Sequence, residues 1–542
     1  MIPCSWRGKN RSGCAGIFTW LYGGRRDDTS LLVYRFQNKC AIDLAADPIA
    51  QFSKIQRSHC CVCVFRTVYR YQCYTGESVE IDANRNNRRK KNVANGTELR
   101  GIALEILLEI TQEKEYSHLA IRNALNKVQY LPKQDRAFIN RLVEGTLEYM
   151  LRIDYVLNQF SSVRVNKMKP VIRNILRSGV YQLMFMDSVP DPAACNEAVK
   201  LAQKKGFYSL KGFVNGVMRN VARKKEEIIY PDKNRDPEEY LSVYYSVPQW
   251  LVKRWVQTYG TETTECMLKD FLTDHPLTIR CQLYRVEPEL TVNSLKGQGA
   301  TVEQAPYLPY AFYLSDYSHL EGLKSFVMGR FVVQDVSSML VTEAADPKPG
   351  DYVIDLCAAP GGKSLHIADK MQGQGMVDAR DLTDYKVGLI EENIERTQTL
   401  NIRAHRKDAT LLDKESVEKA DIVLADVPCS GLGVIGKKTD IKYRTDEDKI
   451  QELSVLQKQI LHNAASYVKP GGILIYSTCT ITSEENQSNV AWFTENYPFV
   501  LESLDPYLCE ELHSETTAQG WLQLLPGVHK TDGFFLARMR KK

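Results

Sequence analysis

The chain has 542 residues, a net charge of +4 at neutral pH, 44% apolar residues and 25% charged residues. These values are ordinary for globular proteins and exclude collagen-like, wholly disordered and coiled-coil chains. The apolar runs are much shorter than the roughly 20 residues of a membrane helix, so we expect a soluble chain with no membrane contact. The length predicts several domains of roughly 100–200 residues each, and so small a net charge does not by itself indicate a polyanionic partner.

Residues 1–95 differ from the rest of the chain in charge and cysteine content. They hold 16 Lys/Arg against 7 Asp/Glu, and seven of the 14 cysteines. No helical or strand period persists here, so we expect a basic, cysteine-rich extension that is disordered. The spacing of Cys60, Cys61 and Cys63 does not match a zinc site, and no metal is predicted. The basic run at 88–91 could contact RNA phosphates or form a solvated linker.

From residue 97 the pattern becomes helical. Leu99, Ile102, Ala103, Ile106 and Ile110 recur at the spacing of one helix face. Further amphipathic stretches follow at 117–127, 133–159, 168–186, 191–205 and 210–225, with prolines and a glycine between them. Residues 97–225 are therefore predicted to form an all-α domain of about six helices.

Residues 226–330 are predicted to form a linker and a small α+β connector. The polar, proline-containing start is typical of a linker. A helical run begins at Trp250 and extends to about Leu272, and Leu277–Cys281 alternates like a strand.

Residues 331–542 are predicted to form an α/β Rossmann-like domain. A buried strand at 351–356 leads into the turn CAAPGGK at 357–363, and a helix begins near Ser364. A strand, a glycine-containing turn and a helix N-terminus form the geometry of a nucleotide site in a doubly wound sheet. The turn lacks the G-x-G-x-x-G dinucleotide pattern. It also lacks a P-loop, because Cys357 stands where the first P-loop glycine belongs.

The next three predicted strands each lead to an acidic residue: Asp381, Asp408 and Asp426. Carboxylates at the carboxyl ends of strands, beside the first turn, can bond a ribose diol and an adenine amino group. A single such aspartate is commonly a helix cap, but three in series after that turn favour a nucleoside ligand.

Two cysteines follow the fourth and fifth predicted strands. Cys429 lies in DVPCSG at 426–431, and Cys479 lies in STCT at 477–480. Either cysteine alone could be a small buried apolar residue. Two cysteines in loops at the same sheet edge as the nucleotide turn favour covalent catalysis by a thiolate.

The turn at 357–363, the Pro-Cys motif at 428–429 and the Thr-Cys motif at 478–479 together resemble the RNA cytosine-5 methyltransferases of the NOL1/NOP2/Sun family. Residues 196–199 and 213–220 resemble the NusB family of RNA-binding helical domains. A NusB-like domain ahead of the catalytic domain resembles the RsmB (Sun/Fmu) branch, which methylates small-subunit ribosomal RNA. The resemblance covers about residues 97–542.

The resemblance implies a role for each motif residue. Cys479 would add to C6 of a flipped cytosine, Cys429 would assist release, and Asp426 would hydrogen-bond the base. Residues 440–444 match a family segment that lines the site. S-adenosylmethionine would be held by the three aspartates and by the turn, comprising Cys357, Ala358, Ala359, Pro360, Gly361, Gly362, Lys363, Asp381, Asp408 and Asp426.

We therefore expect an S-adenosylmethionine-dependent enzyme that methylates cytosine C5 in 16S ribosomal RNA, as a monomer. Because the chemistry needs free thiols, the reducing cytoplasm is the expected location. Two alternatives stay open at this point. The substrate could be transfer RNA, or the chain could be a non-catalytic NusB-like RNA-binding or transcription factor.

Overall fold

The computed structural model describes residues 5–9, 15–19 and 96–542, and the chain divides into two compact units, Met1–Lys91 and Asn92–Lys542. In the first unit, β1 (Ser5–Lys9) and β2 (Ala15–Thr19) pair in antiparallel fashion, a hairpin that the sequence pattern does not predict. The remainder of the expected disordered extension, with its cysteine group at 60–63 and its basic run, lies outside the described residues. Among the described helices, none combines the length and apolar character needed to cross a membrane.

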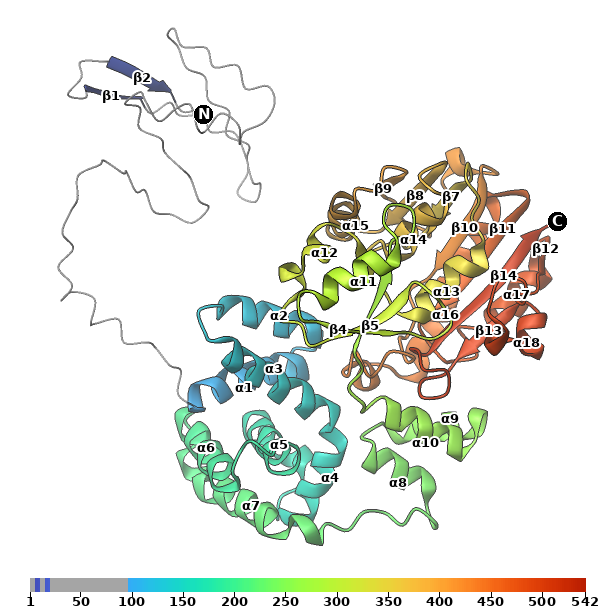
Figure 1. Ribbon diagram of the computed structural model, residues 1–542. Helices are drawn as coiled ribbons and strands as arrows, with labels where there is room; N and C mark the ends of the chain where they lie inside the picture. Colours follow the sequence, from blue (N-terminus) through green and yellow to red (C-terminus); the bar gives the residue numbers. More distant parts are fainter. Residues whose placement is uncertain (1–4, 10–14, 20–95) are drawn as a thin grey trace. The chain divides into compact units, whose positions relative to one another are not determined.

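The second unit begins with the predicted all-α domain, coloured blue to green in Figure 1. The expected stretch at 133–159 is two helices rather than one, because the backbone leaves helical geometry at Tyr149. Helix α5 lies in the core, and a Cβ on Gly145 of α3 would come within 2.0 Å of the Tyr181 ring on α5, so only glycine allows this approach. The helices are α1 (Gly96–Gln112), α2 (Ser117–Lys127), α3 (Lys133–Glu148), α4 (Met150–Phe160), α5 (Pro170–Phe185), α6 (Asp191–Lys204) and α7 (Lys211–Lys224).

The connector contains helices followed by a small antiparallel sheet. The single helix expected from Trp250 to about Leu272 is two helices, because Gly260 adopts a positive φ of 81° between them. The sheet has the order β4-β5-β3-β6 and includes the strand predicted at 277–281. The elements are α8 (Pro237–Tyr244), α9 (Gln249–Tyr259), α10 (Thr261–Asp270), β3 (Leu277–Cys281), α11 (Pro288–Lys296), β4 (Thr301–Gln304), β5 (Ala311–Ser315), α12 (Lys324–Val327) and β6 (Phe331–Val333).

The C-terminal part is the predicted α/β domain (Figure 1). Its main sheet has the order β12-β14-β11-β10-β7-β8-β9, with β13 paired to β14 and with β14 antiparallel to β11. The strands are β7 (Tyr352–Asp355), β8 (Met376–Asp381), β9 (Ile402–Arg406), β10 (Ala420–Asp426), β11 (Val468–Thr478), β12 (Phe499–Leu501), β13 (Trp521–Leu524) and β14 (Phe534–Lys541). The strand order reverses between β7 and β10, which is where ligands bind in doubly wound sheets.

Helices cover both faces of this sheet. Alternate strand residues enter two separate cores, so that Val353 and Leu424 pack on one face while Ile354 and Val423 pack on the other. This alternation follows from the two-residue period of a strand. The helices are α13 (Val336–Ala345), α14 (Gly362–Lys370), α15 (Asp384–Thr397), α16 (Glu447–Tyr467), α17 (Gln487–Asn496) and α18 (Glu515–Ala518).

A buried ion pair ties the connector to the α/β domain. Arg280 on β3 is fully buried and pairs with Asp369 on α14 at 3.0 Å. The same carboxylate accepts hydrogen bonds from the backbone N–H groups of Leu283 and Tyr284 at 2.8 and 3.0 Å. The connector is therefore fixed to the helix that follows the nucleotide turn.

Candidate active site

The turn between β7 and α14 is held by the aspartate at the end of the neighbouring strand. Asp381 accepts hydrogen bonds from the N–H groups of Ala359 at 3.0 Å and Leu382 at 2.7 Å, and it pairs with Lys386 at 3.0 Å. Gly361 has a φ of +102°, a conformation that favours glycine. The predicted turn and Asp381 therefore form one rigid edge.

Asp408 lies at the rim of a hollow at the same edge of the sheet. The volume of this hollow is about 190 Å³. The Asp408 carboxylate accepts hydrogen bonds from the N–H and hydroxyl of Thr410 at 2.9 and 2.7 Å. The hollow is lined by Leu356, Arg380, Lys407, Asp408, Ala409, Leu411, Leu412, Asp413 and Tyr467. The lining mixes apolar side chains with charged ones, and Asp408 is the one predicted cofactor residue in it. The glycine-containing turn after β7, with Asp381 and Asp408 after the parallel neighbours β8 and β9, fits the nucleoside of S-adenosylmethionine.

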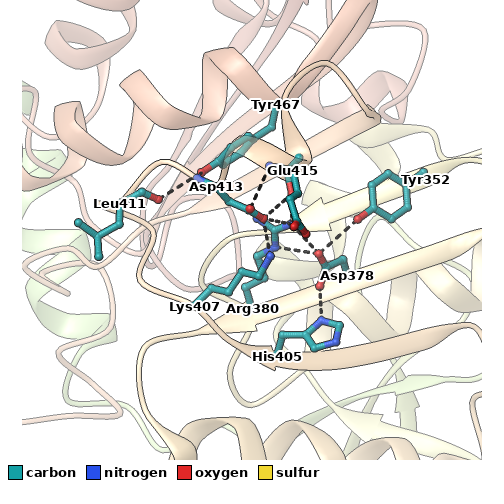
Figure 2. A network of polar contacts seen from close by, with 10 residues as sticks. Tyr352, Asp378, Arg380, His405, Lys407, Leu411, Asp413, Glu415 and Tyr467 are labelled. Atoms are coloured by element: carbon teal, nitrogen blue, oxygen red, sulfur yellow. Dashed lines mark hydrogen bonds and ion pairs between the residues drawn. The ribbon is translucent and has the colours of Figure 1, made fainter.

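A network of charged side chains holds the loop that carries Asp408, as Figure 2 shows. Arg380 donates to Asp378 at 2.6 Å and lies 3.4 Å from Asp413, and His405 contacts the other oxygen of Asp378 at 2.7 Å. Burial raises the pKa of Asp413, but hydrogen bonds from Lys407 and Ser416 outweigh it and lower this pKa to about 2. The Asp413 carboxylate is therefore charged at neutral pH and anchors the loop.

The two predicted cysteines meet at this edge. Strands β10 and β11 are parallel neighbours in which Asp426 pairs with Ser477, so the loops that follow both strands leave the sheet together. The Sγ atoms of Cys429 and Cys479 lie 3.1 Å apart, and both residues are half-buried.

The two thiols of this pair differ in acidity. The hydrogen bond from Cys429 lowers the pKa of Cys479 against the effect of burial, and Lys438 and Lys363 add to the lowering. The contact with Cys479 and burial raise the pKa of Cys429. The arrangement therefore favours a thiolate on Cys479 and a thiol on Cys429.

Asp426 and Lys363 form an ion pair beside the cysteines. The Lys363 ammonium lies 2.7 Å from one oxygen of Asp426, and Ser477 donates to the other at 2.8 Å. Burial lowers the pKa of Lys363, but Asp426 outweighs it and the net shift is upward. Lys363 also lies 5.3 Å from the centre of the Phe534 ring. The resemblance assigned both Lys363 and Asp426 to the cofactor, and the structure pairs these two side chains with each other.

Sequence reasoning missed Glu485, which lies under both cysteine loops. Its side chain is 0% exposed and accepts hydrogen bonds from the N–H of Ser430 at 2.8 Å and from its hydroxyl at 2.5 Å. Thr482 donates to it at 2.6 Å and Gln457 at 2.9 Å. In the sequence, Glu485 follows another glutamate within a polar run, and nothing there separates the fully buried acid from its half-buried neighbour Glu484.

The segment at 440–444, expected to line the site, contacts the helical domain through its polar side chains. Asp440 accepts hydrogen bonds from the N–H and hydroxyl of Ser117, the first residue of α2, at 3.1 and 2.5 Å. Tyr443 donates to the carbonyl oxygen of Leu147 at 2.9 Å. The loop after Cys429 therefore connects the cysteine pair directly to the helical domain.

The sheet order, the nucleoside-fitting edge and the thiol pair define an S-adenosylmethionine-dependent methyltransferase. Three family models match the chain in order. They are the NusB family over residues 97–223, the ferredoxin-like domain of RsmF/B-like methyltransferases over 247–320, and 16S rRNA methyltransferase RsmB/F over 342–540.

Individual relatives span nearly their whole length on this chain. A Bacillus subtilis (strain 168) protein named "Probable ribosomal RNA small subunit methyltransferase B" is 37% identical over 449 residues, 82% of this chain and 99% of the relative. Ribosomal RNA small subunit methyltransferase B of Klebsiella pneumoniae is 28% identical over 458 residues, 84% of this chain and 99% of the relative. The crystal structure of PH0851 superposes with a TM-score of 0.68 at 27% identity, covering 82% of this chain and 98% of that one. The chain belongs to the RsmB/F family of RNA methyltransferases.

Proposed function

We propose that this chain methylates C5 of a cytosine in 16S ribosomal RNA through a covalent bond between Cys479 and C6. The observation that carries the proposal is the 3.1 Å contact between two thiols of opposite pKa shift. The names of the relatives, ribosomal RNA small subunit methyltransferase B, support the substrate.

The first step would be performed by the Cys479 thiolate. C5 of cytosine is a poor nucleophile, and addition of a thiolate at C6 makes C5 an enamine carbon that accepts a methyl group. A thiolate rather than a thiol is the nucleophilic form, and the lowered pKa of Cys479 supports this role. Asp426, paired with Lys363, would hydrogen-bond the base.

The cofactor would be held by the turn at 357–363 together with Asp381 and Asp408. S-adenosylmethionine, when bound, supplies an electrophilic methyl group. Asp381 already fixes the turn through the Ala359 N–H, so the edge needs little rearrangement to receive a nucleoside.

Release of the product would depend on Cys429. After methylation the proton on C5 must leave, and its electron pair re-forms the C5–C6 double bond while the bond from C6 to the Cys479 sulfur breaks. Cys429, in contact with that sulfur, would give its proton to the departing sulfur and, as the thiolate so formed, take the proton from C5.

The RNA would be bound by the helical domain, the connector and the rim of the site. Arg122 on α2 is exposed, as is Lys438 in the loop that joins the cysteine pair to α2. Cations of this kind contact phosphates, and the target base would be flipped out of its stack. The chain is proposed to act as a monomer. The free thiols favour the reducing cytoplasm.

The test is covalent trapping with the two cysteine variants. Cys429→Ala should accumulate a protein–RNA adduct that resists denaturant, because release fails after the bond to C6 has formed. Cys479→Ala should give no adduct and no methylation while still binding cofactor. Cys266→Ala, which removes an exposed thiol on α10, should behave as the wild type.

Mapping of 5-methylcytosine in RNA from cells with and without the protein identifies the substrate. A site lost from 16S ribosomal RNA supports the proposal. A site lost only from transfer RNA, or no lost site, contradicts it.

A further inference from the structure

The two cysteine loops are joined through one buried carboxylate. Glu485 precedes α17 and is 0% exposed. On one side it accepts from the N–H and hydroxyl of Ser430, the residue after Cys429, at 2.8 and 2.5 Å. On the other side it accepts from Thr482, three residues after Cys479, at 2.6 Å.

Two further contacts close this arrangement. Gln457 on α16 donates both to Glu485 and to the carbonyl oxygen of Pro428, each at 2.9 Å. The hydroxyls of Ser430 and Thr480 lie 2.7 Å apart. The residues on both sides of Cys429 are therefore tied to the loop that carries Cys479.

The donors to Glu485 are hydroxyl and amide groups rather than cations. A carboxylate in a buried setting interacts strongly with neighbouring charges because the local dielectric is low. Glu485 holds the loop of Cys429 through Ser430, and Cys429 is the thiol next to Ser430 in the sequence. A second negative charge on Cys429 would therefore be opposed by Glu485.

We propose that Glu485 is a positioning residue that holds the two cysteine loops in contact and keeps the single proton of the thiol pair on Cys429. This inference rests on the proposed function, because only there does the pair have a catalytic task. The charge of Glu485 contributes to the raised pKa of Cys429. The other groups that face the pair are Tyr476 from β11, Asp426 from β10, Lys363 from α14 and Lys438 from the following loop.

The experiment measures the pH dependence of Cys429 alkylation by iodoacetamide, followed by peptide mass spectrometry. A Cys479→Ser background leaves one reactive thiol in the pair. In that background, Glu485→Gln should lower the midpoint pH of alkylation by about one unit, because an uncharged amide no longer opposes the thiolate. Glu484→Gln is the matched control: its half-buried carboxylate pairs with Arg254 instead of the cysteine loops, and the midpoint should not move.

A second measurement uses chains with both cysteines intact. Glu485→Gln should lower kcat for RNA methylation about 100-fold with little change in KM, the size of an acid–base contribution. Glu485→Asp keeps the charge but shortens the side chain. This variant should leave the midpoint pH of Cys429 alkylation unchanged while still lowering kcat. It replaces the glutamine variant in the test if cofactor binding shows that the glutamine variant does not fold.

Two outcomes would overturn the inference. The first is a Cys429 midpoint that does not move in Glu485→Gln. The second is full kcat in Glu485→Asp, which would show that the reach of the carboxylate is not needed. Alkylation uses neither RNA nor cofactor, so it reports on Glu485 even if the wild type proves not to methylate 16S ribosomal RNA.

Discussion

At the scale of single residues, the site depends on where a few charges lie relative to two sulfur atoms. Lys363 and Lys438 favour the thiolate of Cys479, whereas Asp426 and burial oppose it. Lys363 also neutralises Asp426 across 2.7 Å. One ammonium therefore acts on both the nucleophile and the residue proposed to bond the base.

Removing this ammonium should make the nucleophile less acidic. In Lys363→Met, the pKa of Cys479 rises, so the acid limb of the pH profile of kcat/KM should move to higher pH by about one unit. The sign follows because the thiolate is the active form, and the thiolate now requires higher pH. Lys370→Met, on the same helix but paired with Glu343, should leave the limb unchanged. An unshifted limb in Lys363→Met would mean that Lys363 does not act on Cys479.

The sequence predicts a site residue when the residue stands in a short motif, and it does not when the role of the residue depends on contacts distant in the chain. Cys429, Cys479 and the turn at 357–363 stand in short motifs directly after strands, so strand direction alone brings them to one edge. Asp381 was assigned to the ligand, and the structure adds that it also holds the turn. Glu485 could not be found, because its importance comes from donors 28 and 55 positions away in the chain.

At the scale of elements, the 3-10 helix η8 (Ile441–Tyr443) joins the catalytic loop to the helical domain. It buries Lys442 to 1% exposure, with the ammonium 2.8 Å from the carbonyl oxygen of Glu148 at the end of α3. Burial lowers the pKa of Lys442 to about 7, although Glu148 opposes that shift. Burial also raises the pKa of Glu148 to about 7.

This buried lysine should make stability depend on pH. An unfolded lysine has a pKa of about 10.4, so between about 7 and 10 the unfolded chain holds the proton that the folded chain has released. Stability from this group therefore rises with pH across that window, is lost as pH falls toward 7, and is flat below it. Between pH 7 and pH 9, the free energy of unfolding of the wild type should therefore increase by roughly 2–3 kcal/mol more than that of Lys442→Met. Thermal unfolding of both proteins at the two pH values measures this difference.

The control for this prediction lies on the same segment. Lys438→Met removes an exposed lysine and should keep the pH dependence of the wild type. If Lys442→Met keeps that dependence as well, Lys442 is charged in the folded protein and the interface is more hydrated than its burial indicates.

Element types were predictable from periodicity, but breaks within elements were not. The predicted strands at the nucleotide edge all form, because continuous apolar runs bounded by turns are strong signals. The break at Tyr149 falls within a sustained helical pattern, and tyrosine does not indicate that a helix ends. Gly260 is a helix-end signal, but the apolar pattern continues on both sides of it and predicted one helix. The docking of residues 440–444 on α2 and α3 depends on contacts between domains, which no local pattern reports.

At the scale of the whole molecule, all the site residues belong to the unit Asn92–Lys542. The relatives align over 99% of their own lengths with only 82% to 84% of this chain. The family models begin at residue 97. The first 91 residues are a separate compact unit with a surplus of basic side chains.

Removal of residues 1–91 should therefore leave catalysis intact. The expected result is a kcat within about twofold of the full chain, because the relatives align over 99% of their own lengths with the rest of this chain, and the thiol pair, the turn and the Asp408 hollow all belong to Asn92–Lys542. Any effect should fall on RNA affinity and should weaken as salt rises, since basic side chains bind phosphate by releasing counterions. Methylation kinetics of the shortened and full chains at two salt concentrations measure both kcat and the affinity for RNA. A tenfold fall in kcat that persists at saturating RNA would contradict this expectation. It would assign the first unit a part in the reaction itself rather than in RNA attraction.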